Sequence, residues 1–350
     1  MNAGSPTLRP RWVCRSWPAA RFGTTVPGMV HAYPETAAEG TCPVCRAPAP
    51  PLAFVKNGYP MHRCPTCELV YSARPPQGEK LEALYSAQYF TDGGAGYPDY
   101  IADERTHRRQ ARSYLRKISK LDAKPGSVLD VGCATGFFLD EARKAGWTVS
   151  GCELSEYAQR FAERELGLDV VRAGFLDPHF VPRPESFDLI TMFNVLEHVP
   201  DPTGVESKLA NLVRPGGHLV IETWDPHSLF ARMLGPKWPT YAPPTVLYCF
   251  TKRTLTHLFD PERWTLVSYR PAAKWISIDH GLSLLEYEAR KRPPLARLLR
   301  AVRRSWLGRI DVPYCLGDLA LVVFRRTSPL AKTVTDGHTQ KKSFVAMPQS

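Results

Sequence analysis

Residues 128–138, which read VLDVGCATGFF, decide the fold of this chain. An apolar run reaches Asp130, and Gly132 and Gly136 then frame a turn before the apolar residues that open a helix. A strand that passes through a glycine turn into a helix brings backbone amides against a ligand at the carboxyl end of a parallel sheet. The stretch therefore predicts a nucleotide-type binding turn, with an ordinary strand-to-helix turn as the alternative.

A second strand about twenty residues later favours the binding turn. Residues 147–155 read WTVSGCELS and place Glu153 at the end of a strand, where a βαβ fold positions an acid for ribose hydroxyls. Dinucleotide oxidoreductases usually show G-x-G-x-x-G in the first turn, whereas this turn is G-x-x-x-G. The spacing therefore argues against a dinucleotide enzyme.

These segments resemble the first motif and the second strand of class I S-adenosylmethionine-dependent methyltransferases, in their methyltransferase-23-like branch. Residues 187–202, FDLITMFNVLEHVPDP, resemble that family's fourth strand and the loop after it. Residues 212–223, LVRPGGHLVIET, resemble its helix, turn and fifth strand. The resemblance covers residues 123–328 and implies an α/β fold with a doubly wound, mostly parallel, seven-stranded Rossmann-like sheet. Late strands are expected near 264–270 and 319–324, the last of them antiparallel.

The resemblance also implies the cofactor, S-adenosyl-L-methionine. The glycine turn would hold its methionine part, Glu153 its ribose, and Asn194 would lie near the reacting end. Many relatives place an acid after the third strand, but this chain has Phe175 there, which we expect against the adenine ring. The expected cofactor-binding residues are Asp130, Gly132, Cys133, Ala134, Gly136, Glu153, Leu154, Phe175 and Asn194.

Two histidines are candidates for the base that removes a proton from the acceptor. His227 follows the fifth strand and His198 follows the fourth, and imidazole titrates near neutrality. An alternative for His198 and Glu197 is that they orient their loop. A further alternative is weak Mg²⁺ binding at these two residues, as in similar quinone O-methyltransferases.

Four cysteines form a second strong pattern. Cys42 and Cys45 make one C-x-x-C pair, and Cys64 and Cys67 make another after eighteen residues. Four thiolates at this spacing bind Zn²⁺ tetrahedrally and leave no open position, which predicts a structural zinc ribbon over residues 39–74. A pair of disulfides and a redox C-x-x-C are the alternatives, and the absence of an evident secretory signal argues against the disulfides.

The remaining segments complete the expected domain organisation. Residues 1–38 are basic, lack apolar periodicity and are expected to be disordered; a transit peptide and a start at Met29 are both open. Residues 75–122 are expected to form a helical linker that covers the cofactor, with Tyr89 and Tyr97 as the covering rings. Residues 123–328 form the expected methyltransferase domain, and residues 329–350 a flexible tail.

The net charge of +11 is unevenly distributed. Residues 290–310 hold eight basic side chains and no acid, so the folded body outside this segment is not broadly basic. On a helix, its apolar residues fall on one narrow stripe, which we expect to dock on the domain while the arginines meet an anionic substrate. The alternatives for Arg290–Ile310 are an anionic membrane surface and RNA. The residues of the stripe are Leu295, Leu298, Leu299, Val302 and Trp306.

Together these patterns predict methyl transfer to a small molecule or to a glycan or secondary-metabolite precursor, with oxygen as the favoured acceptor atom. The alternative is an RNA methyltransferase that uses the ribbon and the arginine-rich helix; against it, the fourth strand lacks the Pro-Pro-aromatic loop typical of base-amine methylation. An inactive binding protein is disfavoured by the intact cofactor motif. No apolar run approaches the roughly 20 residues that span a bilayer, so a cytoplasmic protein is expected, with peripheral membrane association as the alternative.

Overall fold

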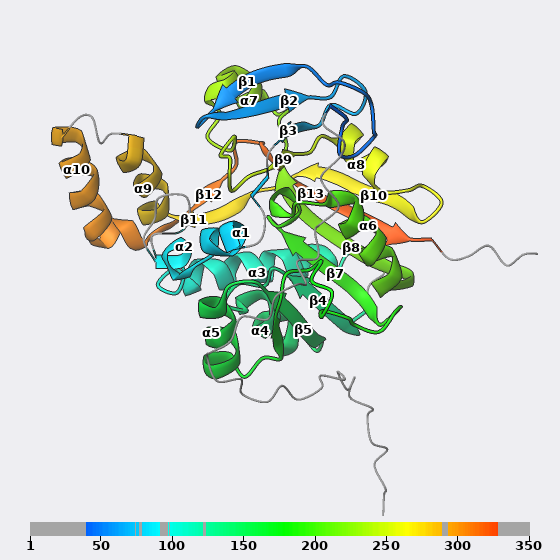
Figure 1. The fold of residues 1–350 in the computed structure, drawn as a ribbon. Coiled ribbons are helices and arrows are strands. Elements are labelled where there is room, and N and C mark those ends of the chain that lie inside the picture. Colours follow the sequence, from blue (N-terminus) through cyan, green and yellow to red (C-terminus); the bar gives the residue numbers. More distant parts are fainter. Residues whose placement is uncertain are drawn as a thin grey trace, which may run out of the picture.

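The computed structural model describes residues 40–73, 75–76, 79–91, 97, 99–121, 124–288 and 293–327 (Figure 1). The basic extension expected over residues 1–38 and the tail expected over 329–350 lie outside the described residues.

A seven-stranded sheet forms the centre of the molecule, with the strand order β10-β13-β8-β7-β4-β5-β6. Strands β6, β5, β4, β7 and β8 are parallel, and β13 is antiparallel to both of its neighbours, β8 and β10. The predicted doubly wound sheet and its antiparallel last strand are therefore confirmed. The strands are β4 (Ser127–Val131), β5 (Thr148–Glu153), β6 (Val170–Arg172), β7 (Phe187–Phe193), β8 (Val213–Trp224), β10 (Trp264–Pro271) and β13 (Leu319–Arg326).

Two apolar cores lie on the two faces of this sheet, because successive side chains of a strand point to opposite faces. In β8, Leu219 and Ile221 join one core and Val220 joins the other. The first core includes residues of α6 (Pro202–Leu212) and α8 (Lys252–Leu258), and the second includes residues of α3 (Glu104–Ile118), α4 (Phe137–Lys144) and α5 (Glu156–Leu166). The strands therefore read as continuous apolar runs in the sequence.

The ribbon, residues 40–73, packs against this domain through a second sheet. Its strands β1 (Leu52–Lys56), β2 (Tyr59–Arg63) and β3 (Val70–Ser72) are antiparallel, and β3 also pairs with β9 (Tyr248–Cys249), which belongs to the segment between β8 and β10. In Figure 1 these strands lie at the top of the molecule, above the large sheet. The domain boundaries expected from the sequence stay a prediction; the ribbon and the domain are joined by β9.

Three smaller groups of elements complete the fold. The segment before α3 contains α1 (Glu79–Leu84) and α2 (Ala87–Thr91), and a short helix after β8 is α7 (Leu229–Leu234), followed by the 3-10 turn η2 (Gly235–Lys237). A two-stranded hairpin consists of β11 (Lys274–Ser277) and β12 (Asp311–Tyr314), and between its strands lie α9 (Ile278–Glu288), α10 (Pro293–Arg304) and η4 (Trp306–Arg309). No helix among the described residues is long and apolar enough to cross a membrane.

The helix pair α9–α10 projects away from the large sheet (Figure 1), which corrects one expectation. Leu295, Leu298 and Trp306 of the apolar stripe are 41%, 61% and 73% exposed, so they do not dock on the domain. The reason is that α10 packs against α9, where Arg303 pairs with Glu286. Contact of this segment with an anionic membrane or substrate stays a prediction.

The link between the ribbon and α8 predicts an effect on stability. The hydroxyl of Thr254 donates to the carbonyl of Cys67 at 2.7 Å, and Thr251 and Thr254 form the capping box of α8. Thr254→Val keeps the shape but leaves that buried carbonyl without this donor, so we expect a loss of about 1–3 kcal/mol in the free energy of unfolding. Urea unfolding measures it. The exposed Thr256→Val is the matched control, and equal midpoints for both variants would contradict the prediction.

Candidate functional site

The turn between β4 and α4 has the geometry that the sequence predicts. Gly132, Ala134 and Gly136 have φ angles of 66°, 48° and 81°, in the left-handed region that favours glycine. A Cβ atom on Gly132 would lie 2.6 Å from Cγ2 of Val195, so the turn also needs glycine for space. The turn thus lies at the carboxyl ends of the parallel strands, where a sheet of this kind binds its ligand.

Glu153 fastens this turn to the second strand. Its carboxylate accepts one hydrogen bond from the amide of Ala134, at 2.9 Å, and another from the amide of Ser155, at 2.8 Å. Burial raises the pKa of Glu153, while these amides oppose the shift. Each carboxylate oxygen keeps a lone pair, so Glu153 can still accept from the hydroxyls of a ribose.

Asp130 lies under the turn and is also buried. The hydroxyl of Thr191 donates to its Oδ1 at 2.7 Å. Burial raises the pKa of Asp130 to about 7, against the effect of the Thr191 hydroxyl, and the charge of Glu153 adds to the rise. The pKa of this carboxyl, near the end of β4, therefore lies well above the ordinary value of an aspartate.

A third acid was not predicted from the sequence. Glu222, on β8, accepts from the hydroxyl of Tyr114 at 2.5 Å and from the side-chain amide of Asn194 at 3.0 Å. The hydrogen bond to Glu222 thereby fixes the orientation of the side chain of Asn194, one of the predicted residues. Asn194 has a φ of 54°, which Asn adopts more readily than most residues. A buried acid within the apolar run LVIETW was the signal in the sequence that could have revealed Glu222.

Several buried polar atoms around this point have no hydrogen-bond partner within the described structure. They belong to the loops after β4, β5 and β7, to the last residues of β8, or to the residue after α1. Buried polar atoms are otherwise nearly always paired, so a group of unpaired polar atoms in one place marks a candidate site for a polar ligand. The atoms are Thr135 Oγ1, Ser155 Oγ, Asn194 Oδ1, Glu222 Oε1, Glu197 Oε1 and the hydroxyl of Tyr85.

Aromatic rings cover the glycine turn. The ring centroids of Tyr89 and Tyr97, the two expected covering residues, are 6.0 Å apart, and Tyr97 lies 4.6 Å from Tyr100. Tyr100 stacks on His107 at 3.8 Å, and both rings are parallel to Phe137, the first residue after the turn. Tyr89, Tyr97 and Tyr100, which we call the lid, therefore lie beside the start of α4, and their closing over the cofactor stays a prediction.

One cation faces these acids. Lys274 is on β11, and its ammonium lies 6.0 Å from the ring centroid of Tyr97. Burial lowers the pKa of Lys274, but Tyr97 and Glu222 reverse the shift and raise it. No sequence pattern pointed to this lysine, because it lies 52 residues beyond Glu222 in the chain.

The other predicted cofactor residues lie in two different surroundings. Cys133 is buried within the turn, and Leu154 lines a pocket of about 710 Å³ between the lid and α5. Phe175 is buried beside Phe180, with ring centroids 6.2 Å apart. The structure therefore does not leave the Phe175 ring open to solvent, and its contact with adenine stays a prediction.

The two candidate bases occupy different places. His198 lies in η1 (Leu196–His198), where its Nδ1 is 2.6 Å from the carbonyl of Thr245, and burial lowers its pKa. A carbonyl only accepts, so Nδ1 carries the proton and Nε2 is free to accept one. His227 is 43% exposed, with Nδ1 3.9 Å from Oε2 of Glu68 in the ribbon. Which of them acts on an acceptor stays a prediction.

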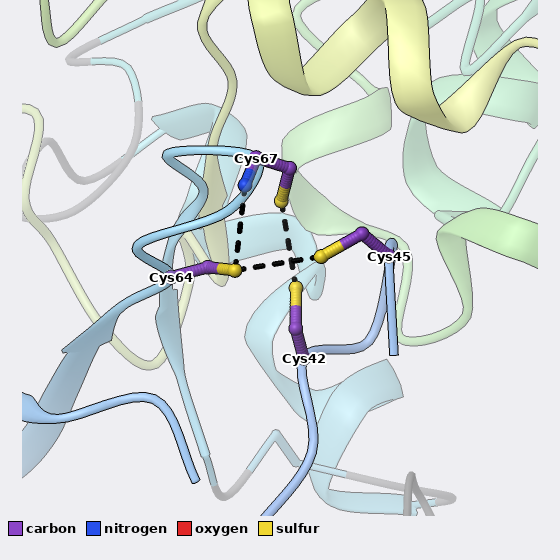
Figure 2. Close-up of side chains that lie close together, drawn as sticks. All are labelled: Cys42, Cys45, Cys64 and Cys67. Atoms are coloured by element: carbon purple, nitrogen blue, oxygen red, sulfur yellow. Dashed lines mark hydrogen bonds between the residues drawn. The ribbon is translucent and has the colours of Figure 1, made fainter. Parts of the chain in front are cut away.

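The four ribbon cysteines converge on one point (Figure 2). All four sulfur atoms lie within 4.8 Å of one another, and two of the Sγ to Sγ distances are 3.5 Å (Cys42 to Cys67) and 3.4 Å (Cys45 to Cys64). A disulfide needs about 2.05 Å, whereas four Zn–S bonds of about 2.3 Å give a tetrahedron with edges of roughly 3.8 Å. The arrangement fits a closed metal site and excludes the disulfide alternative.

The sequence of this chain is similar to those of known proteins. Residues 103–268 match a family described as a methyltransferase domain. A ubiquinone biosynthesis O-methyltransferase of Ralstonia nicotianae is 40% identical over 100 residues, which are 27% of this chain and 42% of that enzyme. An enzyme of the same name from Photorhabdus laumondii is 34% identical over 149 residues, 41% of this chain and 59% of that enzyme. The chain thus spans about half the length of the curated relatives it matches.

Among solved structures, an S-adenosylmethionine-dependent methyltransferase from Mesorhizobium loti aligns with 63% of this chain and 100% of its own, at 21% identity and a TM-score of 0.42.

The carboxyl of Glu197 predicts a pH dependence of stability. Burial raises its pKa to about 8, against the effects of its backbone and of Thr223, and Glu222 adds to the rise. Between about pH 4.5 and 8 the unfolded chain loses this proton and the folded one keeps it, so stability falls as the pH rises, by at most about 1.4 kcal/mol per unit.

Glu197→Gln removes this proton equilibrium and should flatten the fall. Urea unfolding at pH 5, 6, 7 and 8 measures the slope for the wild type, for Glu197→Gln and for the exposed control Glu262→Gln. An unchanged slope in Glu197→Gln would contradict the prediction.

Proposed function

We propose that this chain, a class I S-adenosylmethionine-dependent methyltransferase, methylates an oxygen atom of a small molecule. The observation that carries the proposal is the set of unpaired buried polar atoms at the carboxyl ends of β4, β5, β7 and β8. These positions are where a doubly wound sheet binds its ligand. The names of the curated relatives support an O-methyl acceptor, and a precursor of a quinone is the acceptor class that they suggest.

The residues fit the chemical groups of the cofactor. The Thr135 hydroxyl can donate to a carboxylate, and the oxygens of Asn194 and Glu222 can accept from an ammonium group. The Glu153 carboxylate can accept from ribose hydroxyls. When bound, S-adenosylmethionine supplies a methyl group on a positively charged sulfur.

The residues of the protein then position the acceptor and the cofactor, exclude water and receive a proton. The lid of tyrosines covers the turn, and removal of water strengthens the attraction between the buried acids and a cation. A neutral imidazole, held by its Nδ1 as His198 is, can take a proton at Nε2 from an acceptor hydroxyl. We keep His227 as the second candidate for this role.

Zinc in the ribbon belongs to the same proposal. Four cysteines fill all four positions of the metal, so it would stabilise the ribbon and take no part in methyl transfer. The arrangement supports this because Cys67 is the residue whose carbonyl is bound by Thr254 of α8. A metal at this point would fix the edge of the ribbon against the methyltransferase domain.

The alternative of an RNA methyltransferase has less support. Arg300 and Arg303 of the arginine-rich helix α10 already pair with Glu286, and Arg303 also pairs with Asp279. Ion-paired arginines on this helix are less available to phosphates, because each contact would cost an existing pair.

Substitution of Glu153 tests the cofactor site. In Glu153→Gln an amide group must face either Ala134 or Ser155, so one donor would meet another donor. We expect the dissociation constant of S-adenosylhomocysteine to rise at least tenfold, as for loss of a hydrogen bond to a charged group. Isothermal titration measures it. Glu163→Gln, exposed on α5, is the control, and failure of the wild type to bind S-adenosylhomocysteine would refute the proposed function.

Metal analysis tests the ribbon. We expect one zinc per chain in the wild type, its loss in Cys64→Ser, and its retention in the control Cys315→Ser, whose cysteine is exposed. Loss of the metal should lower the Tm by about 2 °C or more, corresponding to about 1 kcal/mol or more. Absence of metal from purified wild type, with unchanged Tm after addition of zinc, would contradict the proposal.

A further inference from the structure

A separate pocket of about 740 Å³ lies between the ribbon and the segment after β8. Its ribbon side includes Phe54 and Arg63, and its other side includes His227, Arg232 and Tyr241. Figure 1 shows α7, which carries Arg232, beside β1. The volume is typical of a small-molecule site, and none of these residues belongs to the expected cofactor set.

One wall of this pocket is aromatic and firmly held. The ring centroids of Phe54 and Tyr241 are 4.8 Å apart, and Trp238 meets Tyr241 edge-on at 5.0 Å. Trp238 is fully buried, and its indole nitrogen donates to Asp318 at 3.0 Å. A wall built in this way can hold a flat ring without reorganising.

The pocket is also lined by cationic side chains, those of Arg63 and Arg232. Within the described residues, neither Arg63 nor Arg232 has a carboxylate partner. Burial raises the pKa of Tyr241, and the neighbouring Arg63 guanidinium opposes that shift, which places Arg63 against the aromatic wall. At the rim, the Lys56 ammonium donates to the carbonyl of Pro236 at 3.2 Å.

The nearby acid does not cancel these charges. Glu68 has one carboxylate oxygen 3.7 Å from a guanidinium nitrogen of Arg253 and the other 3.9 Å from His227. It is therefore already shared between two other basic groups. Two guanidinium groups without a carboxylate partner and a lysine suit a dianion better than a single carboxylate, and phosphate is a dianion that arginine forks bind well.

We propose that this pocket binds the phosphate-bearing end of the acceptor, with the phosphate attached to a flat ring that rests on Phe54 and Tyr241. The inference rests on the proposed function, because it assigns the ligand to the methyl acceptor, and it replaces the quinone precursor suggested by the relatives' names with a phosphate-bearing acceptor. A nucleoside phosphate has this combination of groups, and its ring would stack while the arginines hold the phosphate.

The position of the pocket agrees with an acceptor. Glu222, at the cofactor site, and Pro226, at the pocket, are four residues apart on the same chain segment, a span of at most about 14 Å. An acceptor can therefore present a hydroxyl to the cofactor while its other end lies in the pocket. Arg63 directly precedes the cluster residue Cys64, so the metal site also fixes one of the two arginines.

Titration with uridine 5′-diphosphate tests the proposal on the full-length, zinc-containing protein. We expect saturable binding that weakens at least tenfold in Arg63→Gln/Arg232→Gln and stays within twofold of wild type in the control Arg253→Gln. Inorganic pyrophosphate should bind more weakly than uridine 5′-diphosphate, because it lacks the ring. If the double variant does not fold, the single variant Arg232→Gln, exposed on α7, should still weaken binding at least threefold.

Three results would overturn the inference: no binding of the diphosphate at millimolar concentration, equal binding by the arginine variants, or tighter binding of benzoate than of the diphosphate. A parallel titration with S-adenosylhomocysteine separates this from the proposed function. Binding of S-adenosylhomocysteine without the diphosphate refutes the pocket alone, whereas no binding of S-adenosylhomocysteine refutes the proposed function. In the arginine variants its dissociation constant should stay unchanged.

Discussion

The site depends on the two hydrogen bonds by which the carboxylate of Glu153 holds the turn after β4. Gly132, Ala134 and Gly136 of that turn have positive φ angles. At Ala134 this conformation is sterically unfavourable, whereas glycine adopts it freely. Glu153 offsets this cost because it accepts from the Ala134 amide, while the Gly132 amide donates to the carbonyl of Cys152. The same acid that is expected to hold the ribose therefore also shapes the turn expected to hold the methionine part.

A second constraint comes from the segment between β8 and β10. It supplies β9 to the ribbon, and the amide of Leu247 donates to the carbonyl of Glu197 in η1. The same segment supplies the carbonyl of Thr245 that holds His198. The ribbon, the candidate base His198 and the wall of the pocket between the ribbon and the segment after β8 are thus positioned by one stretch of chain.

The sequence predicted the parts of this structure that are local. The glycine turn, Glu153 and the paired C-x-x-C motifs each follow from residues that are neighbours in the chain, because close backbone approach and metal geometry restrict which residues can stand there. The mostly parallel, seven-stranded sheet with its antiparallel last strand followed from the family resemblance and is confirmed. Contacts between distant segments could not be predicted: Glu222 meets Tyr114 across more than one hundred residues, and β9 is only two residues long. The stripe of α10 has the right helical period, but periodicity does not say which neighbour covers it, and here α9 does so only in part.

The electrostatics of the site give the strongest argument for a cationic ligand. Burial raises the pKa values of Asp130, Glu153, Glu197 and Glu222, so the protein collects four acids where ionisation is unfavourable. Natural chains rarely place unpaired acids together in an interior unless function requires it. Lys274 is one compensating charge, but Glu222 and Glu197 each still have an oxygen without a partner. A ligand with an ammonium and a sulfonium group would relieve this repulsion and return the acids toward their ordinary pKa values. Binding of the methyl donor should therefore stabilise the fold, because it places positive charge beside these buried acids.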